Sequence, residues 1–423
     1  MKHLPYTLQT LKDAPPFPAT VLMRVDYNVP LEHGQVADDR RLRESLPTIQ
    51  ALLGKGHKVV LLSHLGRPNG PDPQLSLEPI AKHIHKHLGQ PIQFVADTIG
   101  QTARQAIEEL EPGTALLLEN VRFFSQEEQN DAHFAQQLCH NATFFVNDAF
   151  SAAHRAHAST VGVTKYLPSF AGLSLQQEVE TLGSLITDPK RPFVIVLGGA
   201  KISDKVDVVR HLAKVADCVL VGGAIANNFL KADGLEIHKS FFEERSADVN
   251  KRSIDYIRVA RNLLRAHKTE RMLLEKHIPL PKIIYPIDVL AAPNPEAQQT
   301  EIEHIDLTRN NKDTPDDRNI KYFDIGPNTC KLFKAVLSEA KTIFWNGPMG
   351  YWEKPQFSSG TKEIAEFITH SKAHTVLGGG DTNAAVNNFG LEGKYSYSSA
   401  AGGAALEFLS GKLLPGIKPL RKR

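Results

Sequence analysis

Short runs of apolar, often β-branched residues alternate along this chain with segments in which apolar positions recur at helical spacing. This alternation predicts βαβ units, in which a parallel sheet is covered by helices. In the first half the helical spacing occurs at 40–56 and 75–89. The strand-like runs are residues 20–29, 58–65, 114–123 and 142–150 in the first half, and 191–201, 217–226, 282–290, 342–350 and 374–382 in the second.

The two series of strands indicate two domains of the same architecture. A length of 423 residues exceeds what one ordinary core requires. Between the series, residues 172–188 have the pattern of a single helix, and Pro189 and Pro192 follow it. The sequence therefore predicts an N-terminal domain over 1–172 and a hinge helix over 173–190. A C-terminal domain over 191–398 and a terminal segment over 399–423 complete the division.

Composition and charge narrow the classes of function. Hydrophobic residues make up 41% and charged residues 23%, which is typical of a globular protein, and the formal net charge is only +2. Neither nucleic acid nor a membrane is therefore an expected partner. The three cysteines are far apart and lack zinc-ligand or disulfide spacing, and no apolar run reaches membrane-spanning length. We expect a cytoplasmic protein.

Two glycine-rich strand ends in the second half suggest phosphate binding. Residues 196–205 place two glycines before Lys201 and Lys205, whose four-residue spacing puts both on one helical face. Residues 376–386 combine three glycines with Asp381, which suits either a helix N-cap or Mg²⁺ held through nucleotide phosphates. Neither segment is a Walker A motif, and the GxGxxG signal of dinucleotide binding is absent.

Basic residues collect at the strand ends and helix starts of the first half. Because arginine forks bind phosphate or carboxylate bidentately, the set is a plausible anion cradle. For any single arginine a surface ion pair is the better explanation, but their shared location favours one small, highly anionic ligand. Asp26 and Asn28 are placed to hold its hydroxyl groups. The basic set is Arg41, His64, Arg67, Arg122, His154 and Arg155.

Taken together, these segments resemble the phosphoglycerate kinase family. The matching blocks occur in family order across nearly the whole chain. They are residues 24–31, 38–49, 61–68, 116–123, 145–160, 196–205, 324–327, 345–353, 378–382 and 402–416. The resemblance implies an α/β fold with two Rossmann-like parallel-sheet domains joined by a hinge helix, the bilobal fold of the family. It also implies that the C-terminal segment packs back on the N-terminal domain.

The resemblance further implies a monomeric kinase of glycolysis that uses Mg²⁺ with ATP or ADP and transfers phosphate between 1,3-bisphosphoglycerate and ADP. The implied substrate residues are Asp26, Asn28, Arg41, His64, Arg67, Arg122 and Arg155. The implied nucleotide residues are Lys201, Lys205, Glu353, Gly379, Gly380, Asp381 and Thr382, with Asp381 toward the metal. The residues expected at the transferring group are Arg41, Lys205, Gly380 and Gly403.

In-line phosphoryl transfer needs alignment and charge neutralisation rather than an enzyme nucleophile. We therefore expect Arg41 and Lys205 to carry positive charge to the transferring group, assisted by backbone amides of the glycine turns. Two sites on separate domains require closure, which we expect at 173–190 and near 395–405.

Several positions depart from the family pattern. Ala400 and Ala401 replace a threonine and a glycine in the terminal hinge, and Tyr397 replaces a histidine. Asn227 and Asn228 replace a Phe-Thr pair, and Tyr322 replaces a glycine, which leaves the choice between ATP and GTP open. Three alternatives are a catalytically dead binding protein, a kinase of the same fold for another anionic acid, and a nicotinamide dehydrogenase.

Overall fold

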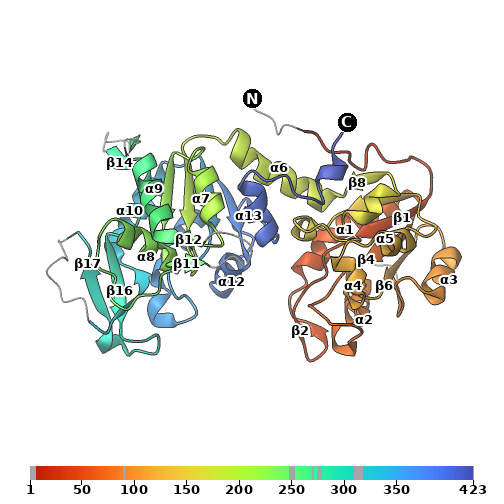
Figure 1. Ribbon diagram of the computed structural model, residues 1–423, viewed down its shortest axis with the longest axis horizontal. Helices are drawn as coiled ribbons and strands as arrows, with labels where there is room; N and C mark the ends of the chain where they lie inside the picture. The colour runs from red at the N-terminus through yellow and green to blue at the C-terminus, as the bar shows by residue number, and fades with distance from the viewer. Residues whose placement is uncertain are drawn as a thin grey trace. The chain divides into compact units, whose positions relative to one another are not determined.

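The computed structural model describes residues 6–88, 92–246, 253–268, 271–273, 279–308 and 318–422. The chain forms two compact units (Figure 1). Unit 1 contains residues 1–184 and 412–423, and unit 2 contains residues 185–411. The boundary falls inside helix α6 (Leu173–Thr187), the segment that the sequence predicts as the joint.

Unit 1 is built on a six-stranded sheet with the order β5-β6-β4-β1-β7-β8, and every pair in it is parallel. Because parallel strands need crossover connections, the intervening helices cover both faces of the sheet. The strands are β1 (Thr20–Arg24), β4 (Lys58–Leu62), β5 (Ile92–Val95), β6 (Ala115–Leu118), β7 (Phe144–Asn147) and β8 (Ser169–Ala171). A short hairpin, β2 (Leu31–Glu32) with β3 (Gln35–Val36), follows β1.

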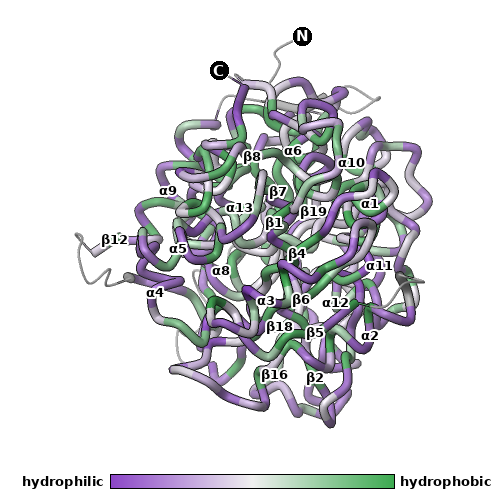
Figure 2. Tube along the Cα trace, turned by 90° about the vertical axis from the view of Figure 1, so that its right-hand side faces the viewer, coloured by the Kyte–Doolittle hydropathy of each residue, from purple (hydrophilic) through white to green (hydrophobic). Residues whose placement is uncertain are grey.

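Alternate residues of β1 enter two separate cores. Val21 and Met23 pack with apolar residues of α1 and α2, whereas Leu22 packs with those of α3 and α5. This period of two is what a strand covered on both faces requires, and it explains why the strands of unit 1 are hydrophobic along most of their length (Figure 2). The helices are α1 (Arg40–Leu53), α2 (Glu78–Leu88), α3 (Gln101–Glu109), α4 (Ser125–Glu128) and α5 (Ala132–Leu138).

Unit 2 has a second parallel sheet with the order β15-β10-β9-β19-β20-β21. Numbered along the chain within this sheet, the order is 3-2-1-4-5-6, the Rossmann arrangement. The direction of winding reverses between β9 and β19, and ligands of such sheets bind at that point, beyond the carboxyl ends of the strands. The strands are β9 (Phe193–Leu197), β10 (Cys218–Val221), β15 (Ile283–Ile284), β19 (Thr342–Asn346), β20 (His374–Gly378) and β21 (Tyr397–Ser398).

The helices of unit 2 are α7 (Val206–Leu212), α8 (Gly223–Ala232), α9 (Tyr256–Ala266), α10 (Pro327–Ser338), α11 (Ser359–Thr369), α12 (Gly380–Asn388) and α13 (Gly403–Leu409). Two small antiparallel pairs join β11 (Arg245–Ser246) to β12 (Ile254–Asp255) and β13 (Arg271–Leu273) to β14 (Pro279–Pro281). The predicted α/β fold with two parallel sheets is confirmed.

One predicted strand of unit 2 is divided between two sheets. The run 282–290 gives β15 in the parallel sheet, and then β16 (Asp288–Ala292) in a separate antiparallel sheet. There β16 pairs with β17 (Glu303–Asp306) and β18 (Lys321–Ile325). Pro286 lies between the two short strands, and its ring removes a ladder donor, so a continuous strand through it is disfavoured.

A buried carboxylate joins β16 to α10. Asp288 is 1% exposed, and its carboxylate accepts hydrogen bonds from the Asn328 amide at 2.9 Å and the Thr329 amide at 2.7 Å. The Thr329 hydroxyl donates to the same group at 2.6 Å. The carboxylate therefore satisfies donors in the first turn of α10 that have no partner within the helix.

We predict that Asp288→Ala lowers the free energy of unfolding of unit 2 by about 1–3 kcal/mol, because it leaves these buried donors without an acceptor. Both tryptophans, Trp345 and Trp352, lie in unit 2, so fluorescence during urea unfolding reports on it. Glu296→Ala, which removes only an exposed partner of Lys354, is the control and should cost much less. An Asp288→Ala midpoint equal to that of the control would contradict this role.

Candidate active site

In unit 2, the loops that leave β9 and β19 cross at the point where the strand order reverses. The Gly198 amide donates to the Asn346 carbonyl at 3.0 Å, and the Gly199 amide donates to the Pro348 carbonyl at 2.8 Å. Gly347 has a φ of +94°, and a Cβ there would lie 2.3 Å from both the Gly198 carbonyl oxygen and Lys205 Nζ. Only glycine allows this close approach of the two loops.

Lys205 places its ammonium group at this crossing. Nζ donates to the Gly198 carbonyl and, at 3.2 Å, to the Asn346 carbonyl, so carbonyls at the ends of both strands orient the charge. Burial lowers the pKa of Lys205 to about 8, while the carboxylates of Asp381 and Asp204 act in the opposite direction. A cation fixed at a strand-end crevice, with part of its solvation lost, interacts more strongly with an anion than an exposed lysine does.

A cavity of about 340 Å³ opens beside this crossing. It is lined by Gly199, Ala200, Gly223, Ala224, Phe241, Lys321, Tyr322, Phe323, Pro348, Gly350, Tyr351, Trp352, Glu353 and Asp381. Three of the predicted nucleotide residues stand in or at it: Glu353 and Asp381 in the wall, and Lys205 close to Gly199. Its remaining walls are largely apolar and aromatic.

The other residues predicted for this site do not line the cavity. Thr382 is fully buried; its hydroxyl accepts from the Gly347 amide at 2.6 Å and donates to the Gly378 carbonyl at 2.8 Å. Gly379, with a φ of +93°, and Gly380 form the turn from β20 into α12. Lys201 is exposed and does not line the cavity, and Gly403 is an exposed residue at the start of α13.

Two aromatic side chains of the wall, Phe241 and Tyr351, are the part of this cavity that the sequence reasoning missed. Phe241 is 52% exposed and Tyr351 is 39% exposed, unusually high values for large apolar rings. Asn227 and Asn228 do not face the cavity. Their amides donate to the Phe241 carbonyl at 2.8 Å and the Glu243 carbonyl at 2.7 Å, and so they hold the segment that carries Phe241. Tyr322, which stands where the family has a glycine, does line the cavity.

In unit 1, the residues after β1 form the first part of a polar site. Arg41 Nη1 lies 2.8 Å from Asp26 Oδ2 and donates to the Asn28 carbonyl at 3.0 Å. The Ser151 hydroxyl also donates to Asp26, and the Asn28 side-chain oxygen accepts from the Gly66 amide at 2.9 Å. Asp26, Asn28 and Arg41 are thus brought together as the sequence predicts.

Behind these residues lies a buried arginine that sequence reasoning missed. Arg24, the last residue of β1, is 1% exposed; its Nη2 lies 2.9 Å from His64 Nδ1. Because a guanidinium only donates, Nδ1 accepts, and the neutral His64 ring carries its proton on Nε2. Burial, reinforced by the charge of Arg24, holds the pKa of His64 well below its usual range. The imidazole therefore faces its surroundings as a neutral donor.

Two other arginines predicted for this site, Arg122 and Arg155, lie close enough to interact with each other. Arg122 is 9% exposed, and it donates to the Gly66 carbonyl at 2.7 Å. Burial lowers its pKa; Glu128 opposes this shift, and Arg24 and Arg155 add to it, so three guanidinium groups share one neighbourhood. Arg155 is half-buried, and Arg67 is exposed beside Gly66. An excess of like charge held close together is costly unless an anion joins it.

The chain is similar in sequence to proteins of one family. A family model described as phosphoglycerate kinase matches residues 12–412. The chain belongs to the phosphoglycerate kinase family. It is 43% identical over 419 residues to the phosphoglycerate kinase of Dictyoglomus turgidum, with 99% of each chain covered. The counterpart in Moorella thermoacetica is 44% identical over 417 residues, covering 98% of this chain and 99% of that one.

Solved structures of phosphoglycerate kinases are similar in fold to this chain. The structure of phosphoglycerate kinase from Coxiella burnetii has a TM-score of 0.82 at 35% identity, covering 98% of this chain and 99% of that chain. The crystal structure from Pyrococcus horikoshii OT3 has a TM-score of 0.78 at 31% identity and covers 98% of both. The predicted family is therefore confirmed. Among the described residues, no helix is long and apolar enough to cross a membrane.

We predict that His157, beside this basic cluster, remains neutral down to about pH 4. Burial and the charge of Arg122 lower its pKa to about 4. A folded-state pKa below the unfolded value means that unit 1 loses stability as the pH falls from about 6.5 toward 4. The loss attributable to this group should be about 1–3 kcal/mol. His157→Gln should remove that part of the slope in acid unfolding, and an NMR titration of the His157 ring near pH 6.5 would disprove it.

Proposed function

We propose that this chain is a phosphoglycerate kinase that moves a phosphoryl group reversibly between 1,3-bisphosphoglycerate and ADP. The observation that carries the proposal is the Lys205 ammonium at the crossing of the β9 and β19 loops, beside a cavity with Asp381 in its wall. Family membership and the basic cluster of unit 1 support the same reaction. A dehydrogenase is not favoured, because the GxGxxG signal of dinucleotide binding is absent from the sequence.

We assign the acid substrate, 3-phosphoglycerate, to unit 1. Asp26 and Asn28 would take its hydroxyl, and the neutral Nε2–H of His64 would donate to an oxygen of the ligand. The guanidinium groups of Arg67, Arg122 and Arg155 would bind its phosphate. This division follows from chemistry: a carboxylate accepts from a hydroxyl, whereas guanidinium forks match phosphate oxygens.

On the nucleotide side, we assign ATP or ADP to the cavity of unit 2. Aromatic walls suit a base, and Glu353 suits the ribose hydroxyls. Lys205, with Lys201 toward the rim, would meet the phosphates, with backbone amides of Gly379 and Gly380 at the start of α12. The Thr382 hydroxyl is used within the loops, so its part in this proposal is to fix the turn.

Asp381, one of two carboxylates in the cavity wall, fits a magnesium ion held mainly by nucleotide phosphates. Among the described residues, no three His, Cys, Asp or Glu side chains gather as a metal site of their own. Asp381 is exposed at the cavity and lies close enough to Lys205 to affect its pKa. Mg²⁺ commonly takes one or two protein carboxylates together with substrate phosphates, and its chemistry would be charge neutralisation.

The proposed step is direct in-line transfer. Arg41 and Lys205 neutralise charge on the transferring group, and the amides of Gly380 and Gly403 assist. The ligands belong to different units, so the reaction requires closure, which we place at 173–190 and near 395–405. The domain division at 172, 190 and 398, the return of residues 399–423 to the N-terminal domain, a monomeric state and a cytoplasmic location belong to this proposal.

We predict turnover in a coupled assay with 3-phosphoglycerate and Mg-ATP, run in parallel with Mg-GTP. Lys205→Ala should lower kcat by about 10²–10³-fold, the cost of one electrostatic donor to the transferring group. Lys214→Ala, which removes an exposed lysine elsewhere in unit 2, should remain near wild type. A folded protein that binds 3-phosphoglycerate but turns over neither nucleotide would support the binding-protein alternative instead.

We predict that Arg41→Ala lowers kcat by about 10²–10³-fold while its neighbours are tolerated. Arg40 and Arg43 lie on the same helical turn, but they contact Asp38 and Asp39 rather than Asp26. Arg40→Ala and Arg43→Ala are therefore matched controls for lost charge. A rate for Arg41→Ala within threefold of wild type would remove this residue from the reaction.

A further inference from the structure

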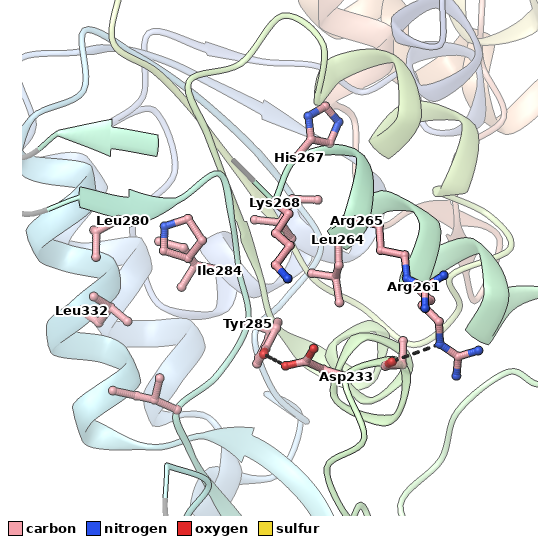
Figure 3. A pocket seen from close by; sticks show the side chains of 14 residues that line it. Asp233, Arg261, Leu264, Arg265, His267, Lys268, Leu280, Ile284, Tyr285 and Leu332 are labelled. Atoms are coloured by element: carbon pink, nitrogen blue, oxygen red, sulfur yellow. Dashed lines mark hydrogen bonds between the residues drawn. The ribbon is translucent and has the colours of Figure 1, made fainter. Parts of the chain in front are cut away.

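A second cavity of about 640 Å³ lies in unit 2 and shares no residue with the candidate active site. Its walls come from the end of α8, the second half of α9, β14, the segment from β15 to Ile287, and Leu332 of α10 (Figure 3). The volume is in the range of small-molecule sites. Nothing in the proposed kinase reaction uses this cavity.

One side of the cavity is aliphatic. Ile283 and Ile284 are buried, whereas Leu264, Leu280, Ile287 and Leu332 are only half-buried and keep apolar surface toward the open volume. Figure 3 shows Leu280, Ile284 and Leu332 together on one side. Two rings also line the cavity: the phenol of Tyr285, whose hydroxyl donates to Asp233, and the imidazole of His267. Because most of the apolar lining is aliphatic, this side of the cavity offers an alkyl chain extensive apolar contact.

The other side is cationic. Arg261, Arg265 and Lys268 line the cavity from α9 and its end, against a single carboxylate, Asp233. No Asp or Glu occurs from 256 to 268. In Figure 3, Arg261 and Arg265 stand on the side opposite the aliphatic wall.

The two arginines have the spacing that brings like charges together. Arg261 and Arg265 are four residues apart on α9, an arrangement that destabilises a helix when both carry the same charge. Arg261 Nε donates to the Ala232 carbonyl at 3.3 Å, which orients it. In the part of the chain that the structure describes, neither guanidinium is paired with a carboxylate. A ligand anion would offset this repulsion.

We propose that this cavity binds an aliphatic chain with a terminal carboxylate or phosphate, such as a fatty-acid-like anion. The alkyl part would lie on the leucine and isoleucine wall, and the head group would be held by the forks of Arg261 and Arg265. An organic cation is disfavoured by the three basic side chains. A neutral alcohol would use only the apolar half of the site.

The test uses the full-length protein and isothermal titration calorimetry, with each probe kept below its micelle concentration. Decanoate and decyl phosphate are the two anionic probes, and decanol and decylamine are the matched neutral and cationic ones. We expect both anions, or one of them, to bind at least tenfold more tightly than decanol. Affinity should rise roughly fourfold per methylene from hexanoate to decanoate. The stronger of the two anionic probes identifies the head group.

The matched variants locate the site. Arg261→Gln combined with Arg265→Gln should weaken decanoate binding at least tenfold. Arg258→Gln removes one charge from the same helix outside the cavity wall, so it should leave binding unchanged. Kinase rates of all variants should stay near wild type, which shows that they fold. Equal binding of decanol and decanoate, equal losses in the cavity and control variants, or no binding of either anion would overturn the proposal.

Discussion

The candidate active site of unit 2 depends on one arrangement: an ammonium group held by carbonyls from two adjacent strand ends. Lys205 bonds to Gly198 and Asn346, and the loops that carry them approach so closely that a side chain at Gly347 would displace the charge. The same crossing fixes Thr382 through the Gly347 amide, and with it the turn into α12. The position of the Lys205 ammonium group and the geometry of the two loops therefore depend on the same contacts.

Unit 1 solves the related problem of holding several cations together. Its buried Arg24 is not left alone: the Ser159 hydroxyl lies 2.8 Å from Nε, and the same hydroxyl donates to the buried Glu127 at 2.6 Å. Burial raises the pKa of Glu127, while Arg24 opposes that rise. This inner group takes up the charge of Arg24 and fixes the tautomer of His64, whereas the outer guanidinium groups of Arg41 and Arg122 have carboxylates of their own, Asp26 and Glu128.

Both sheets and part of the polar site of unit 1 can be predicted from the sequence, because they depend on local patterns of residues. Alternation of apolar runs with helical spacing predicted both sheets, and the rule that chemistry collects at the carboxyl ends of parallel strands predicted the neighbourhood of Asp26 and Arg41. The role of Arg24 is not predicted because the residue lies within the apolar run 20–29 and its partners Ser159 and Glu127 are more than 100 residues away in the sequence. The break between β15 and β16 is not predicted because Pro286 lies within one apolar run, 282–290.

The two cavities show why the apolar residues that line a cavity are harder to predict from the sequence than the charged ones. Asn227 and Asn228 suggested altered contacts with a base, yet both amides are spent on the backbone of 241–243, and the side chain they place at the cavity is Phe241. Two buried residues thus act on the cavity surface through a third. The same reasoning applies to the second cavity: its aliphatic wall is assembled from separate segments, whereas its charged side follows one helix whose basic residues are visible in the sequence. Charges along one element can be predicted, but the apolar surface facing them is set by tertiary packing.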